Sequence, residues 1–92
     1  MQVQILESKE AIYPNTGRHV LVVMQCGKSK MSVSANSKYV NAVVHNASNR
    51  AWKGWGKFYR NFDEAFTNYR SAEARAMLDA AQALWNSNEV AA

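Results

Sequence analysis

The sequence predicts an α+β fold, in which an antiparallel sheet of three to four strands packs against a C-terminal helical layer. Short segments rich in β-branched residues, separated by turn residues, fill the first two thirds of the chain, and an Ala-rich helical stretch fills the last third. The 92 residues suit one hydrophobic core, so we expect a single domain spanning residues 1–92. Hydrophobic residues make up 48% and charged residues 20%, a composition typical of a folded protein.

The sheet is expected to begin near the N-terminus. Val3 and Ile5 alternate with glutamines, as in a short strand with one polar face, and residues 13–17 form a turn cluster. Residues 19–26 are a continuous apolar run that is too short for a typical helix. Gly17 and Gly27 bound this run, which favours a central strand.

The next segments continue the sheet. Residues 31–35 alternate between apolar and polar side chains, and we expect them to form a hairpin with residues 19–26. Residues 39–45 fit either a strand or a helical stripe, and their β-branched side chains favour a strand. A loop is expected over residues 46–56, and residues 57–59 could add a short edge strand.

The C-terminal third has the pattern of an amphipathic helix. Asn61 and Glu64 have the spacing of a capping box, so a helix should begin near Phe62. It either continues to about Trp85 or breaks at Ser71, which could cap a second helix. The main apolar stripe expected to face the core is Phe62, Ala65, Phe66, Tyr69, Ala76, Met77, Ala80 and Leu84.

A second, smaller apolar stripe lies beside the first. It comprises Ala74, Leu78, Ala81 and Trp85. Two interpretations are open: a lateral contact with the N-terminal strand, or a protein interface, for example in a homodimer, that uses Leu78 and Trp85.

The charges are divided unevenly along the chain. Residues 11–62 contain eight Lys or Arg and no Asp or Glu, whereas the rest of the chain has three cations and seven acids. The division predicts an electropositive surface made by the middle of the chain. The eight cations are Arg18, Lys28, Lys30, Lys38, Arg50, Lys53, Lys57 and Arg60.

No residue pattern indicates catalysis or a cofactor. His19 and His45 are the only candidate bases, and neither has a nucleophile and an orienting acid nearby in sequence. These two histidines and the single cysteine, Cys26, do not have metal-ligand spacing, so we expect no metal, no cofactor and no enzyme. The lone cysteine, and the absence of a signal peptide pattern or a membrane-length apolar run, suggest a cytoplasmic protein.

The strongest binding signal is residues 50–60, where four cations are interleaved with four aromatic residues. Stacking on unpaired bases combined with phosphate neutralisation requires such a mixture. Alternatively, some of the aromatic side chains anchor the loop to the sheet. The predicted partner-binding residues are Arg50, Trp52, Lys53, Trp55, Lys57 and Arg60, with Lys28, Lys30 and Lys38 extending the patch if the sheet brings the turns together.

In its length and α+β order, the chain resembles the small phage-encoded anti-CRISPR proteins and looks most like an inhibitor of the type I-F surveillance (Csy) complex. The resemblance implies a non-enzymatic protein that binds the Cas protein–guide RNA complex, through Cas7/Cas8-type subunits and guide RNA, in the host cytoplasm. Many such inhibitors are acidic DNA mimics, whereas the basic segment here favours contact with guide RNA that blocks its pairing with target DNA. The alternative is a free-standing DNA- or RNA-binding regulator of a phage or plasmid.

Overall fold

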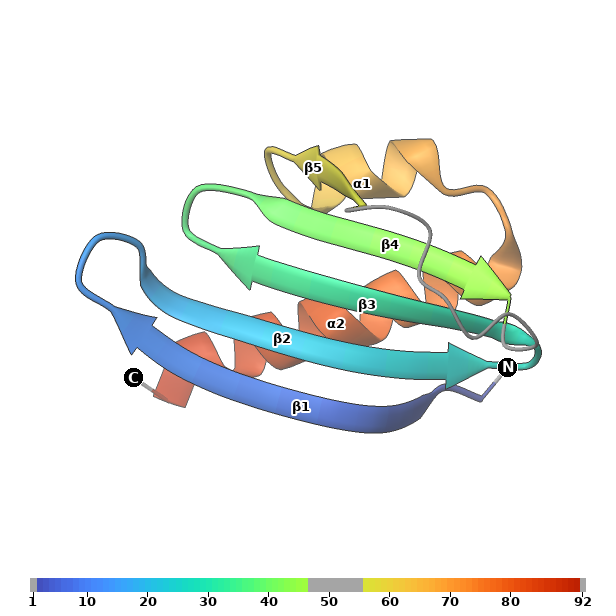
Figure 1. Cartoon of the computed structure of the whole chain (residues 1–92), viewed down its shortest axis with the longest axis horizontal. Helices are drawn as coiled ribbons and strands as arrows, with labels where there is room; N and C mark the ends of the chain where they lie inside the picture. The colour runs from blue at the N-terminus through green and yellow to red at the C-terminus, as the bar shows by residue number, and fades with distance from the viewer. Residues whose placement is uncertain (1, 47–55, 92) are drawn as a thin grey trace.

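The computed structural model describes residues 2–46 and 56–91, and the side chains of residues 2–44 and 56–87. Five strands form one antiparallel sheet in the order β1-β2-β3-β4-β5, so each strand pairs with its neighbour in sequence (Figure 1). The strands are β1 (Gln4–Tyr13), β2 (Gly17–Cys26), β3 (Ser29–Asn36), β4 (Val40–Asn46) and β5 (Lys57–Tyr59). Two helices follow, α1 (Phe62–Asn68) and α2 (Ala72–Ala91).

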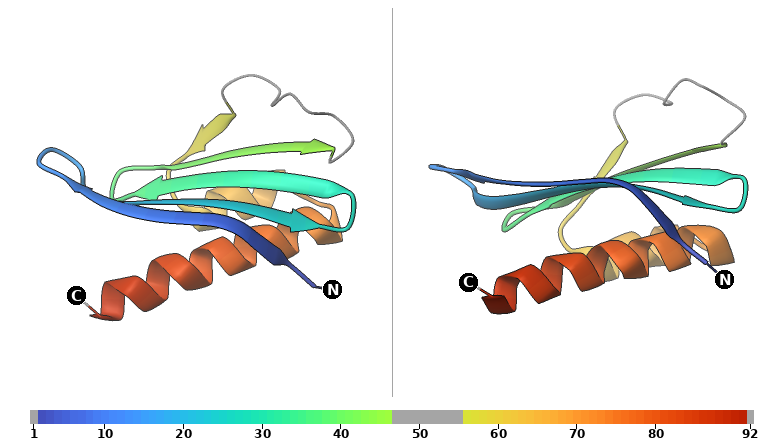
Figure 2. Two further views of the ribbon diagram at one scale, coloured as in Figure 1. Left: turned by 60° about the horizontal axis from the view of Figure 1, so that its bottom comes forward. Right: turned by 90° about the horizontal axis from the view of Figure 1, so that it is seen from below.

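One face of the sheet forms the core. Alternate side chains of β2 and β3 are buried, as the period of two in a strand requires. Both helices lie on this side (Figure 2), and α2 packs against β2 and β3. The buried strand residues are Val20, Val22, Met24, Cys26, Met31, Val33, Ala35, Val40, Ala42 and Tyr59.

The helical layer is two helices rather than one. The Asn61 side chain accepts a hydrogen bond from the Glu64 backbone N–H at 2.9 Å and caps α1. The chain is extended at Tyr69, with φ −111° and ψ 122°. Ser71 Oγ then accepts a hydrogen bond from the Ala74 N–H at 3.2 Å, at the start of α2. Of the two expectations, the break at Ser71 is the one observed.

The break also changes which stripe of α2 faces the core. Because the extended residues reset the helical phase, the stripe continued from α1 does not point straight at the sheet. Its members Ala76, Ala80 and Leu84 are only partly buried. The core-facing side of α2 therefore lies between the two predicted stripes: Met77 of the main stripe is buried, together with Ala74, Leu78 and Ala81 of the second stripe.

The predicted fold class is confirmed, with a larger sheet than expected. β1 runs for ten residues, well beyond the short strand predicted around Val3 and Ile5. Residues 40–46 form a strand, as their β-branching indicated, and Lys57–Tyr59 pairs with Val40–Ala42 as an edge strand. The sheet therefore has five strands rather than three to four.

Candidate functional site

The second face of the sheet carries the candidate site. Both described helices lie against the first face, so none of them covers the second (Figure 2). Residues directly opposite each other in an antiparallel pair point to the same side, so the register identifies the side chains of this face, which we call the open face. Its described members are Gln4, Glu7, Lys9, Ala11, Tyr13, His19, Leu21, Val23, Gln25, Lys30, Ser32, Ser34, Asn36, Asn41, Val43 and Phe58.

The described acidic side chains are divided unevenly between the two sides of the sheet. Among the described acidic side chains, Glu7 is the only one on the open face, and its carboxylate lies 3.0 Å from the Lys9 ammonium. Lys30 adds a second cation to this face. The other described acids lie on the helix side: Glu10, Asp63, Glu64, Glu73 and Asp79. The open face is thus the less acidic of the two, which favours an anionic partner.

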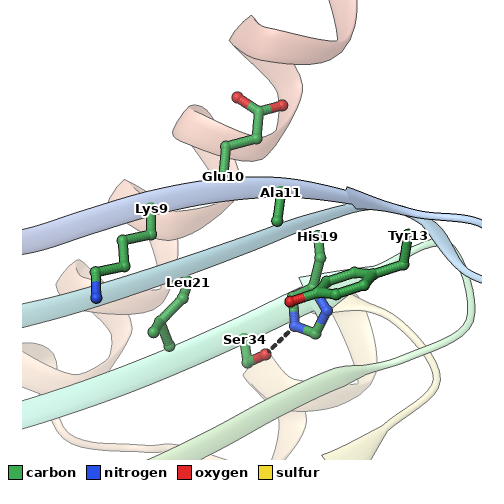
Figure 3. A pocket seen from close by; sticks show the side chains of 7 residues that line it. All are labelled: Lys9, Glu10, Ala11, Tyr13, His19, Leu21 and Ser34. Carbon is green, nitrogen blue, oxygen red and sulfur yellow. Dashed lines mark hydrogen bonds between the residues drawn. The ribbon is translucent and has the colours of Figure 1, made fainter.

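A first hollow of about 460 Å³ lies over β1, β2 and β3 on the open face. The β1–β2 hairpin places the Tyr13 ring edge-to-face with the His19 imidazole, with centroids 5.7 Å apart and planes at 70°. His19 Nε2 and Ser34 Oγ share a hydrogen bond of 2.5 Å (Figure 3). Glu10 borders the hollow, but its side chain points away from the other six residues drawn. The hollow therefore combines aromatic walls with a polar pair at its base.

A second hollow, of about 550 Å³, lies over β3, β4 and β5 and shares Ser34 with the first. Its other lining residues are Tyr39, Asn41 and Phe58. The Tyr39 and Phe58 rings are also edge-to-face, with centroids 5.0 Å apart and planes at 81°. Each hollow is therefore bordered by a pair of aromatic rings.

Two local features position the rings of the second hollow. Asn36 Oδ1 accepts hydrogen bonds from the backbone N–H groups of Lys38 and Tyr39, at 2.8 and 3.0 Å, and so shapes the β3–β4 turn. Gly56 precedes β5 with φ +78°, and a Cβ there would lie 2.8 Å from the Ala42 carbonyl oxygen. Only glycine fits this close approach, which sets β5, and with it Phe58, beside β4.

Part of the predicted basic and aromatic segment can be placed. Arg50, Trp52, Lys53 and Trp55 lie outside the described residues. Lys57 is exposed on β5, with its ammonium 5.8 Å from the Tyr59 ring centroid. The Arg60 side chain is 89% exposed and lies 3.5 Å from Glu64, a pairing worth little at such exposure. Lys57 and Arg60 are therefore accessible cations near the edge of the sheet.

The predicted extension of the patch does not form one surface. Lys28 and Lys30 lie at the β2–β3 hairpin, whereas Lys38 lies in the β3–β4 turn at the opposite end of β3. β3 has eight residues, so these turns are separated by about 25 Å. Arg18, counted among the eight cations, instead points to the helix side, where it pairs with Glu10 at 2.5 Å and lies 4.4 Å from the Trp85 ring centroid.

The second helical stripe packs within the domain. Leu78 is fully buried in the core, so it offers no surface to a partner in this fold. Trp85 is partly buried under the Arg18 guanidinium, and its carbonyl accepts a hydrogen bond from Arg18 Nη1 at 2.9 Å. The stripe therefore packs within the domain, against β2 and β3, where the expected intramolecular contact was with the N-terminal strand. These contacts do not support a homodimer interface through Leu78.

Of the residues that line the two hollows, sequence reasoning singled out only Phe58, as one of the four aromatic residues of segment 50–60. Tyr13 falls in the predicted turn cluster of residues 13–17, and His19 is considered only as a candidate catalytic base. The signal that could have found them is the alternation within residues 19–26, whose odd-numbered members share a face. The apolar character of both faces of this run concealed that alternation.

Chemically, the described residues form a binding surface. No cluster of three or more His, Cys, Asp or Glu that could hold a metal occurs among them. Burial, a hydrogen bond with Tyr59 and the electrostatic interaction with Tyr59 raise the pKa of the Tyr69 phenol above its ordinary value. Tyr69 lies on the helix side and is not part of the open face. No helix in the described ranges is both long and apolar enough to cross a bilayer.

In comparisons with known proteins, no family model, no curated protein and no solved structure matches the chain.

Proposed function

We propose that the protein is a non-enzymatic binding protein whose open face binds single-stranded nucleic acid. The observation that carries the proposal is the placement of Tyr13, Tyr39 and Phe58 on a sheet face whose only described carboxylate is already paired with a lysine. Aromatic rings stack on the faces of unpaired bases, contributing roughly 1–3 kcal/mol per base. A duplex hides those base faces, so single strands are the better fit.

Accessible cations supply the phosphate contacts. Lys9 and Lys30 lie on the open face, and Lys38 is exposed in the β3–β4 turn at its margin. Lys57 is exposed on the edge strand, but it is opposite the buried Ala42 and so points to the helix side. Each phosphate contact releases counterions, so the affinity should fall as the salt concentration rises. The net charge of +4 supports the same class of partner.

The resemblance to anti-CRISPR proteins suggests a more specific form of this proposal, in which the bound strand is the guide RNA of a Cas protein–guide RNA complex. A basic face cannot imitate a phosphate backbone, so such an inhibitor would contact the guide and block its pairing with target DNA. Affinity capture from a lysate containing the type I-F complex, with and without ribonuclease, tests this form. Capture of Cas subunits that is unaffected by ribonuclease would point to a protein contact instead.

Fluorescence anisotropy with labelled 12-nucleotide RNA, DNA and duplex DNA tests the general proposal. Tyr13 and Phe58 are 51% and 59% exposed, so Tyr13→Ala and Phe58→Ala should leave the fold intact. Each should weaken single-strand binding by about tenfold, or about 1.4 kcal/mol. Ile12→Ala is the matched control, because Ile12 is 80% exposed on the same strand but points to the other face.

Two outcomes contradict the proposal. One is tighter binding to duplex than to either single strand. The other is an equal loss of affinity in Ile12→Ala and Tyr13→Ala, since only the second residue lies on the open face.

A further inference from the structure

We infer that the two hollows receive two separate bases of one strand, so that a bound single strand crosses the β-strands instead of running along them. This inference rests on the proposed function. It adds the direction of the bound chain and the size of the site.

A row of paired residues connects the two hollows across the whole sheet. Lys9 is opposite Leu21, Leu21 is opposite Ser34, Ser34 is opposite Asn41 and Asn41 is opposite Phe58. We call these five residues the crossing row. Ser34 in its middle lines both hollows. A ligand that follows this row therefore passes directly from one hollow to the other.

The spacing suits two bases that are not stacked on each other. The first hollow is centred near β2 and the second near β4, because each spans three neighbouring strands. Two strand separations amount to about 10 Å. Stacked bases lie only about 3.4 Å apart, so a strand that fills both hollows must separate its bases over the polar Ser34 between them.

The positions of the described aromatic rings favour this path over one that runs along the β-strands. Tyr13, Tyr39 and Phe58 lie in the crossing row or at the end of the sheet beyond it. Toward the other end, the next described row contains Glu7, Val23, Ser32 and Val43, and the following one begins with Gln4, Gln25 and Lys30. These described side chains include no Phe, Tyr or Trp. A strand running along β2 or β3 would therefore leave the stacking rings after its first base.

Backbone amide chemical shifts measured during titration test the path. The ligands are a mononucleotide and a tetranucleotide of the preferred backbone type. The tetranucleotide should shift the amides of Ala11, Leu21, Asn41 and Phe58 while leaving those of Gln25 and Lys30 unchanged. Shifts that spread along β2 and β3 to Gln25 and Lys30 would overturn the inference, even though the protein binds nucleic acid.

Variants supply a second, independent readout. With the tetranucleotide, Tyr13→Ala and Phe58→Ala should each cost about tenfold in affinity, and the double variant about a hundredfold, because both hollows are occupied. With the mononucleotide, which fills one hollow at a time, the double variant should lose only about tenfold instead of a hundredfold. Val23→Ala is the matched control on the open face but outside the crossing row, and it should stay within twofold of wild type.

The outcomes separate this inference from the proposed function. If no oligonucleotide binds the wild-type protein, the proposed function fails and the inference fails with it. If the tetranucleotide binds but only one of the two aromatic variants weakens it, the proposed function stands and the two-base path is wrong.

Discussion

The two faces of the sheet are built from alternate residues of the same strands and have opposite properties. Val22 points to the helices and is 1% exposed, whereas its neighbour Val23 points to the open face and is only partly buried. The core of the covered face is made of apolar side chains, from Ala35 to Tyr59 in size, that pack under the helices. The open face places rings, hydroxyls and amines around two hollows. Stability and binding can therefore be changed separately, by substituting neighbouring residues.

The largest expected effect is in the core of the helix side. Leu78→Ala should lower the free energy of unfolding by about 3 kcal/mol, because Leu78 is fully buried and its truncation leaves a cavity. Denaturant unfolding followed by circular dichroism measures the change. A loss below about 1 kcal/mol, together with a protein-concentration-dependent midpoint in the wild type, would instead support an intermolecular role for Leu78.

A pair of identical substitutions compares the two faces directly. Val22→Ala should cost about 2 kcal/mol and Val23→Ala less than about 1 kcal/mol, since only the first side chain is fully removed from water. Their unfolding curves should have the same denaturant slope. Equal losses would mean that the open face is covered in solution.

Gly56 lies where the edge strand joins the open face. Gly56→Ala should cost about 2 kcal/mol, because it combines a left-handed backbone with a Cβ 2.8 Å from the Ala42 oxygen and 3.0 Å from Val43 Cβ. Gly27→Ala is the control: its φ is +62°, but nothing lies within 4 Å of the added Cβ. The control should therefore show only the backbone cost, about 1 kcal/mol.

Binding should separate these two glycine variants further. Gly56→Ala displaces β5 and with it Phe58, so oligonucleotide affinity should fall even where the variant remains folded. Gly27→Ala should bind as wild type does at the same fraction folded. Unchanged affinity in Gly56→Ala would remove β5 from the proposed site.

Local patterns made most of the fold predictable from the sequence. The alternation over residues 31–35 predicts a half-buried strand, and the spacing of Asn61 and Glu64 predicts the start of α1. Both signals depend only on residues that are close together in the sequence. The break at Ser71 could not be decided from the stripe alone. The hydrogen bond from the Ala74 N–H to Ser71 Oγ favours a helix start at this point. The apolar stripe continues past Ser71 and equally favours one unbroken helix, so the pattern does not distinguish the two.

The candidate site was much less predictable, because it depends on long-range register. Ser34 lies between Leu21 and Asn41 only because three strands pair in one particular register, and a shift by one residue would move all three side chains to the other face. The sequence interpretation favoured residues 50–60 because their cations and rings are contiguous. In the described structure, Phe58 of this segment borders a hollow together with Tyr39, and Tyr13 borders the other hollow, so rings from distant positions in the sequence share the open face.

The smallest expected effect concerns pH and again separates the two faces. Burial raises the pKa of Tyr69 on the helix side, so the folded protein holds this proton more tightly than the unfolded chain, in which tyrosine has a pKa near 10. Above about pH 10 the unfolded chain releases the proton first, and the free energy of unfolding should fall as pH rises; below pH 10 Tyr69 adds no pH dependence.

Thermal unfolding at pH 8 and near pH 11 measures this effect. Between pH 8 and pH 11, the Tm of Tyr69→Phe should fall by less than the Tm of the wild type, because the variant has no phenolic proton to release at this position. Tyr13→Phe, an exposed tyrosine of the open face, should keep the wild-type difference. If the Tm falls by the same amount in both variants, Tyr69 is not the group responsible for the alkaline sensitivity.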